Sequence, residues 1–224
     1  MRSNGRASRE RLAWFLAAGM CVVALATWWA WDRHRRGGDL ESAASSDEAA
    51  RRIAAARELA DRDSDAATDL LLRMIDDSNP AVASQAVESL GIHRDPARRE
   101  VVAQVLAERH RPAQVRAMAA ATYGRFDHAD PAPLIDVLGS GDDPLVRAGA
   151  ARGLARLRDP RSLPALVRAL DDGDQRVRLW AISAIHNMTT RRFPYDAATA
   201  PAQQREVIQR IKNYMRSGGI QGIE

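Results

Sequence analysis

The sequence predicts an all-α protein, an α-solenoid of about five antiparallel helix pairs preceded by one transmembrane helix. A unit of 31 to 33 residues recurs along most of the chain. Asn-Pro and Asp-Pro pairs stand at the expected starts of helices, and twenty residues near the N-terminus carry no charge. A fixed period with one helix pair per unit is typical of solenoids, whose units bury their apolar faces by stacking on their neighbours.

Residues 12–31 are predicted to form a membrane-spanning helix after a basic tail at residues 1–11. At about 1.5 Å per residue, the run is long enough to cross a hydrocarbon core of about 30 Å. Tryptophans lie near both ends of the run, where indole rings favour the membrane interface. The predicted anchor residues are Leu12, Trp14, Phe15, Trp28, Trp29 and Trp31. The alternative is a signal peptide that is cleaved after Ala26.

The excess positive charge of the chain is concentrated next to this apolar run. Residues 1–36 contain seven Arg, Glu10 and Asp32, whereas the rest of the chain contains 26 basic and 27 acidic side chains. The repeat region is therefore close to neutral, which argues against a nucleic-acid partner. Arginines flank the run on both sides, and a short basic tail retained inside favours export of the repeat region. We expect a single-pass protein of the inner (plasma) membrane with an extracytoplasmic repeat domain.

The other predicted elements are arranged in order along the chain. Residues 32–47 are polar and contain Gly and Ser, which predicts a flexible linker. The repeat domain is expected at residues 48–217, and residues 48–62 and 65–75 have the apolar spacing of an opening helix pair. In the last repeat, a stretch without helical spacing separates the first helix from a final helix. Residues 218–224 should fray.

Asn-Pro and Asp-Pro pairs mark the helix starts between these ends. An Asn or Asp side chain caps a free amide, and Pro at the first helical position loses no internal hydrogen bond. The pairs are Asn79-Pro80 and Asp143-Pro144 before first helices, and Asp95-Pro96, Asp130-Pro131 and Asp159-Pro160 before second helices.

Four columns of residues recur at matching positions of the first helices. They are Val82, Val115, Val146 and Val177; Ala86, Ala119, Ala150 and Ala181; Leu90, Tyr123, Leu154 and Ile185; and Gly91, Gly124, Ala155 and His186. Positions four apart lie on one helix face, so each first helix presents the same apolar stripe. A column filled by alanine predicts helices that approach closely.

The Asp-x-x-Val-Arg starts at Asp143 and Asp174, the small-residue column and the Asp-Pro before the second helix resemble HEAT repeats, particularly the short bacterial type also found in phycobilin lyases. The resemblance covers roughly residues 47–217. It implies a scaffold or adaptor that binds a protein partner and has neither catalytic activity nor a cofactor. A bilin-lyase-like enzyme and a HEAT-like protein of DNA binding or base excision are the alternatives.

Arginines recur at one position of the repeats, and aspartates precede some of them. These residues are Arg116, Arg147, Arg178, Asp143 and Asp174. The resemblance to HEAT repeats implies that they form a structural ladder between repeats, whereas a stripe that binds an anionic ligand is the alternative.

The last repeat contains the candidate partner-binding residues Trp180, Phe193 and Tyr195. Phe193 and Tyr195 are expected to cover the exposed end of the solenoid, with a binding loop as the alternative. Trp180 replaces smaller or more flexible residues of other repeats and is either core or an exposed anchor. His186 is expected to pack under the loop. We predict no metal site. Cys21 lies in the apolar run, and the His residues other than His186 lack the spacing of metal ligands.

Overall fold

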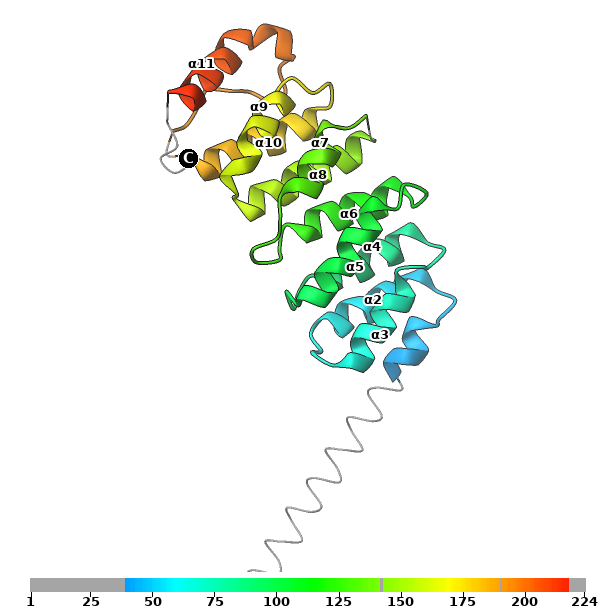
Figure 1. The fold of residues 1–224 in the computed structure, drawn as a ribbon. Coiled ribbons are helices and arrows are strands. Elements are labelled where there is room, and N and C mark those ends of the chain that lie inside the picture. Colours follow the sequence, from blue (N-terminus) through cyan, green and yellow to red (C-terminus); the bar gives the residue numbers. More distant parts are fainter. Residues whose placement is uncertain (1–38, 142, 190, 218–224) are drawn as a thin grey trace, which may run out of the picture.

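The computed structural model describes residues 39–141, 143–189 and 191–217, and the regular structure in these ranges is helical throughout. Helices α2 to α11 of this part form five consecutive pairs. Figure 1 shows the pairs stacked into an elongated body, with α2 and α3 near one end and α11 at the other. The predicted all-α solenoid is therefore confirmed for the part of the chain that the structure describes.

Each pair consists of a first and a second helix that run antiparallel. The first helices are α2 (Ala49–Ala60), α4 (Pro80–Leu90), α6 (Ala113–Tyr123), α8 (Pro144–Leu157) and α10 (Gln175–Met188). The second helices are α3 (Asp65–Met74), α5 (Pro96–Ala107), α7 (Ala132–Gly139), α9 (Leu163–Ala169) and α11 (Arg205–Arg216). Short 3₁₀ turns, η1 (Pro160–Ser162) and η2 (Pro201–Gln203), precede α9 and α11.

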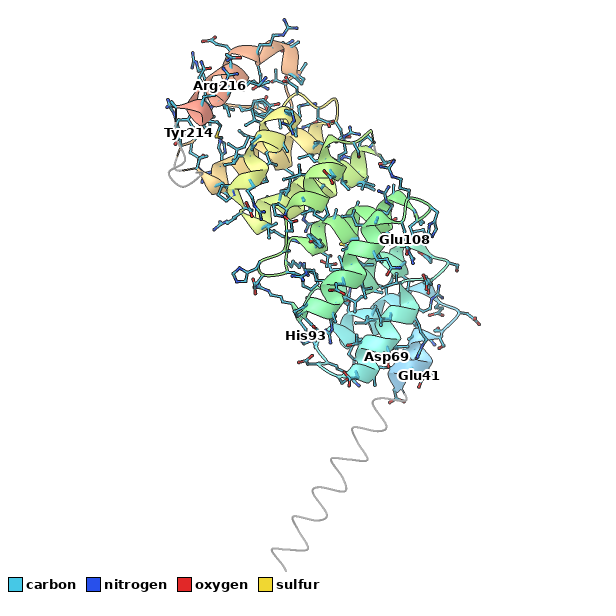
Figure 2. All side chains as sticks on the ribbon, viewed as in Figure 1. Glu41, Asp69, His93, Glu108, Tyr214 and Arg216 are labelled. Carbon is cyan, nitrogen blue, oxygen red and sulfur yellow. The ribbon has the colours of Figure 1, made fainter. Side chains whose placement is uncertain are left out.

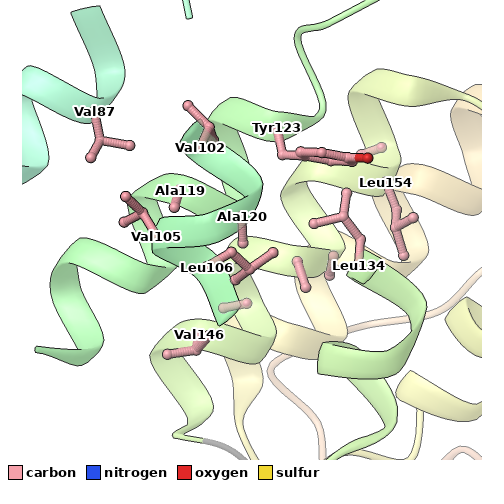
Figure 3. Packing of buried hydrophobic residues seen from close by; sticks show 14 of the residues in the cluster. Val87, Val102, Val105, Leu106, Ala119, Ala120, Tyr123, Leu134, Val146 and Leu154 are labelled. Atoms are coloured by element: carbon pink, nitrogen blue, oxygen red, sulfur yellow. The ribbon is translucent and has the colours of Figure 1, made fainter. Parts of the chain in front are cut away.

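The apolar columns of the first helices form one continuous core. The valine column is at most 2% exposed, and the alanine column is completely buried. The third column, which contains Tyr123, is at most 5% exposed. Figure 3 shows Ala119, Ala120 and Val146 of neighbouring first helices close to Leu106 and Leu134 of the second helices. The predicted inward faces are confirmed by this burial.

The backbones of α6 and α8 lie in direct contact. A Cβ atom added to Gly149 would lie 2.4 Å from the carbonyl oxygen of Ala117, and one added to Gly153 would lie 2.4 Å from that of Ala120. Glycine is therefore required at both positions, because any side chain would push the two helices apart. The close approach predicted from the small residues is present.

Side-chain caps begin five of the ten helices α2 to α11 of the described residues. Asn79 accepts a hydrogen bond from the backbone N–H of Ala81 at 2.9 Å, and Asp95 accepts one from Ala97 at 3.0 Å. Asp143 accepts from Leu145 at 2.7 Å, so α8 has the same type of start. These bonds satisfy amides that have no partner within their own helix.

Residues 39–44 form a short helix, so the predicted flexible linker at residues 32–47 is wrong for this segment. Leu40 is 6% exposed and Ala44 is 8% exposed, and both belong to the apolar core. The opening pair has no preceding repeat in the described part, and this short helix covers some of its apolar surface. Leu40 and Ala44 lie four residues apart on one face, a spacing too short to stand out within a polar stretch.

Candidate functional site

Two arginines of the first helices bind the turn that leads into the next repeat. Arg147 donates from Nε and Nη2 to both carboxylate oxygens of Asp172, at 2.8 and 2.9 Å. Asp172 also accepts from the backbone N–H of Asp174 at 2.8 Å, and Asp174 caps α10 through Arg176. The arginine of one repeat therefore fixes the start of the next helix through one bidentate pair.

The same arrangement recurs at the beginning of the stack. Arg52 donates to Asp77 at 2.6 and 2.9 Å, and Asp77 accepts from the backbone N–H of Asn79, the cap of α4, at 2.8 Å. The hydrogen bonds from Arg52 hold the pKa of Asp77 below its usual value, although burial opposes this effect. Burial also raises the pKa of Asp172, but the hydrogen bonds from Arg147 and from the Asp174 amide outweigh it, so the net shift is downward.

The predicted ladder residues occupy different positions in this arrangement. Asp143 and Asp174 are helix caps, and the carboxylate bound by Arg147 is that of Asp172, which was not predicted from the sequence. The hydrogen bond to Asp172 contributes most to the raised pKa of Arg147, and the charges of Asp174 and Asp143 add to it. Arg116 is buried and donates to the carbonyl oxygen of Leu106 at 3.0 Å.

The C-terminal cap, which we define as residues 191–204 together with α11, covers the end of the last repeat. Phe193 is 6% exposed and lies edge-on to Tyr214 of α11, with 5.4 Å between the ring centroids. Tyr195 donates its hydroxyl to the carbonyl oxygen of Leu170 at 2.6 Å. Figure 2 shows Tyr214 and Arg216 at the end of the molecule opposite Glu41. This geometry agrees with the cap interpretation of Phe193 and Tyr195 rather than with an exposed binding loop.

His186 lies under the cap, as expected for a residue that breaks the small column. Its Nε2 accepts a hydrogen bond from the backbone N–H of Phe193 at 3.0 Å, and the two rings stack with centroids 6.3 Å apart. Burial lowers the pKa of His186, and the nearby charge of Arg192 lowers it further. The neutral imidazole is therefore the form that fits the folded cap.

We expect acid to weaken the cap through His186. Because its folded pKa lies below the unfolded value of about 6.5, the unfolded chain binds more protons in the interval between them, and stability falls as the pH falls through it. Lowering the pH from about 7.5 to about 5.5 should reduce the melting temperature by about 2–4 °C more in the wild type than in His186→Gln, whose amide oxygen accepts without titrating. Equal pH profiles of the two proteins in thermal unfolding would contradict this role.

Trp180 is partly buried and lies beside an arginine of the preceding repeat. The guanidinium carbon of Arg152 on α8 lies 5.5 Å from the centroid of the indole ring. This is cation–π geometry, and it holds the Arg152 side chain against α10. The Nε atom of Arg152 is buried and has no hydrogen-bond partner in the structure. Trp180 is thus neither wholly core nor wholly exposed, and its role in binding a partner remains a prediction.

Two adjoining hollows cross the C-terminal ends of the first helices. One has a volume of about 670 Å³ and the other of about 340 Å³, and both are lined by Ile92 and Arg125. We call them together the first-helix groove. Its charged side chains are Arg57, Asp61, Glu88, Arg94, Arg125, Asp127 and Arg156, and it also contains Ile92. The groove is built by four repeats whose residues lie far apart in the sequence.

This groove was not predicted from the sequence, although a signal for it was present. Ile92, Arg125 and Arg156 follow the small column by one residue in three successive repeats. The arginines of the predicted ladder lie inside the helices. The column of Ile92, Arg125 and Arg156 lies where each first helix ends and was not part of that prediction. Gly91 and Gly124 also line the larger hollow. A Cβ atom added to Gly91 would lie 2.3 Å from Cγ2 of Thr122, and one added to Gly124 would lie 2.1 Å from the carbonyl oxygen of Gly153, so both glycines allow the neighbouring first helices to pack closely.

The predicted anchor residues and the basic tail lie outside the described residues. Within the described ranges, no helix is long and apolar enough to cross a bilayer. The same ranges contain no group of three or more His, Cys, Asp or Glu side chains placed to hold a metal ion.

Antiparallel helix pairs in one stack, with an arginine of one repeat bound to the next turn, define an α-solenoid repeat protein. A family profile of HEAT repeats matches residues 39–124 and 101–186. These ranges cover more than half of the chain, which therefore belongs to the HEAT-repeat family. The resemblance found in the sequence is confirmed for the repeats.

Solved structures give weaker likenesses, and no curated protein sequence matches the chain. One engineered protein is 18% identical over 84% of this chain and 90% of its own, with a TM-score of 0.47. A second engineered protein is 19% identical over 78% of this chain and 51% of its own, with a TM-score of 0.43. Human deoxyhypusine hydroxylase is 18% identical over 66% of this chain and 83% of its own, with a TM-score of 0.29.

Proposed function

We propose that this protein is a membrane-anchored HEAT-repeat scaffold that binds a protein partner and has no catalytic activity of its own. HEAT repeats commonly mediate contacts between proteins, and the five helix pairs of the described residues present one extended surface. The repeats would supply the binding surface, and the apolar N-terminal segment would confine that surface to a bilayer.

The observation that carries this proposal is the first-helix groove. Side chains from α2, α4, α6 and α8 or their following turns line it, so a partner there would contact several repeats at once. A surface composed of separate repeats is rigid only when the stack is intact, and the buried Val, Ala and Leu columns provide that rigidity. Solenoids use such extended surfaces to bind other chains.

The membrane part of the proposal is supported by the apolar run at residues 12–31 and its terminal tryptophans. We propose that the chain is a single-pass protein of the bacterial inner membrane with its repeats on the extracytoplasmic side. The short basic tail before the run favours this orientation.

We expect the full-length protein to stay with vesicles during carbonate extraction, because a spanning helix is held by the hydrophobic effect rather than by charge. A C-terminal alkaline phosphatase fusion should be active, since that enzyme requires export. The control is a chain in which Val22, Val23 and Leu25 are replaced by Asp, which should be released into the soluble fraction. Release of the unmodified protein by carbonate would refute the anchor, and an inactive fusion would reverse the orientation.

Proximity labelling from a tag at the C-terminus tests the scaffold itself. The expected result is one defined protein, recovered reproducibly from the wild type and lost from a variant in which the repeats do not fold. Salt-dependent binding of DNA, or a coloured adduct formed with a bilin, would instead favour one of the two alternatives.

A further inference from the structure

We propose that the first-helix groove binds an acidic segment of the partner protein that also carries an aliphatic side chain. This inference rests on the proposed function, because it names the site and the partner chemistry of that scaffold. Three features support it: the clustering of guanidinium groups, their fixed positions, and an exposed isoleucine in the same groove.

Positive charge accumulates at the α8 end of the groove, where Arg125 and Arg156 line the larger hollow and Arg152 lies outside its lining. Arg152 and Arg156 lie one helical turn apart on α8, and Arg125 lies at the end of α6. The negative charge of Glu88 raises the pKa of Arg156, but the Glu88 carboxylate already accepts a hydrogen bond from Arg125 at 3.1 Å. Partial burial lowers the pKa of Arg156, and the charges of Arg152 and Arg125 lower it further. A carboxylate placed among these groups would relieve their mutual repulsion.

The remaining charged pair in the larger hollow is already satisfied. Arg94 binds Asp127 at 3.0 and 3.3 Å, so these two charges offset each other. Since Arg125 also pairs with Glu88, the excess charge in the larger hollow falls on Arg156, and Arg152 adds to it from one turn earlier on α8. This excess is local, because the chain after residue 36 is close to neutral.

Both of these guanidiniums are held in place before any partner binds. Arg156 donates from Nη1 to the carbonyl oxygen of Ala121 at 2.9 Å, and Arg152 lies over the ring of Trp180. Neither contact uses a carboxylate. Fixed guanidinium groups lose little freedom on binding and present a planar fork that matches the carboxylate geometry.

An apolar contact lies beside this charge. Ile92 is 48% exposed and is shared by both hollows, although large aliphatic side chains in this fold are generally buried. A peptide with an aliphatic residue beside Asp or Glu would cover Ile92 and neutralise the guanidiniums together. A nucleic acid would satisfy the charge but would leave Ile92 without an apolar partner.

The test is selection of random peptides, displayed on phage, against the full-length protein in a zwitterionic detergent. The selected peptides should be enriched in Asp or Glu next to Leu, Ile or Val. A labelled synthetic peptide of the most enriched sequence should lose about tenfold or more in affinity for the variant R152Q/R156Q. Ile92→Ser, at a half-exposed position, should weaken binding by about threefold or more with an unchanged melting temperature. The control Arg168→Gln removes one positive charge from the exposed side of α9 and should bind like the wild type.

Three results would overturn the inference: no enriched peptide, enrichment without acidic residues, or binding that R152Q/R156Q and Ile92→Ser both leave unchanged. None of these refutes the scaffold, which fails only if labelling recovers no defined partner. If R152Q/R156Q is unstable, two other measurements test the inference. They are the peptide affinity of Ile92→Ser and the loss of peptide binding by the wild type as salt is added.

Discussion

Gly149→Ala is expected to destabilise the repeat domain by about 2 kcal/mol or more, although alanine is the better helix former. The new Cβ would lie 2.4 Å from the carbonyl oxygen of Ala117 and 2.9 Å from its Cα. Both atoms belong to the backbone of α6, which cannot move without displacing the whole helix. Overpacking of this kind costs about 1–3 kcal/mol and sometimes more, which exceeds the gain of about 1 kcal/mol in helix propensity.

The loss should appear as a change in cooperativity as well as in stability. Each repeat contacts its neighbours alone, so a weakened contact between α6 and α8 uncouples the helices before it from those after it. Urea unfolding followed by circular dichroism should broaden or divide into two transitions. Gly139→Ala is the matched control, because a Cβ there would have no atom within 4 Å, and it should be neutral or slightly stabilising. Equal effects of the two substitutions would refute the close contact.

The architecture was predictable because it depends on periodicity. Val146 and Val177 repeat the same local pattern, and burying that pattern requires a neighbour with the same pattern. The caps at Asn79 and Asp95 were predictable for a similar reason, since a helix start is decided by the side chains within one turn. Local sequence therefore specified where the helices begin and which of their faces are buried.

The contacts between repeats were less predictable because they depend on how the turns are folded. Arg147 was predicted to join two repeats, and it does so. Its partner Asp172 lies 25 residues away, in a turn whose shape is not specified by any local sequence pattern. Asp174, two residues later, is closer to the repeated motif and is used as a cap instead. A period identifies equivalent positions but does not pair them with one another.

The groove was not predicted for a further reason. Arg125 and Arg156 look like ordinary surface arginines in a chain with 33 basic residues. Their significance arises from the stacking of neighbouring first helices, which places Arg125 and Arg156 in one hollow with the exposed Ile92. Aligned columns can show that these positions are equivalent, but only the stacked helices show that they share one hollow.

Arg178→Met should detach the C-terminal cap and cost about 3 kcal/mol. Arg178 occupies the position of Arg147 in the last repeat, but no further repeat supplies an aspartate in the described part. It is 5% exposed and donates to the carbonyl oxygen of Ala197 from Nε at 3.1 Å and from Nη2 at 2.7 Å. Its Nη1 donates to the carbonyls of Asp172 and Gly173 at 2.9 and 3.0 Å. Methionine preserves much of the apolar stem but leaves these carbonyls without a donor.

The cap thus occupies the position that a following repeat has elsewhere in the described stack, and the side chain that joins repeats elsewhere joins the cap here. Hydrogen exchange read by mass spectrometry should show loss of protection in residues 191–217, whereas α4 and α6 keep theirs, because contacts in a solenoid are local. Arg176→Met removes an exposed pair with Asp174 on the same helix and should change protection little. If Arg178→Met leaves residues 191–217 as protected as in the wild type, packing by Phe193 and Ile211 holds the cap without the arginine.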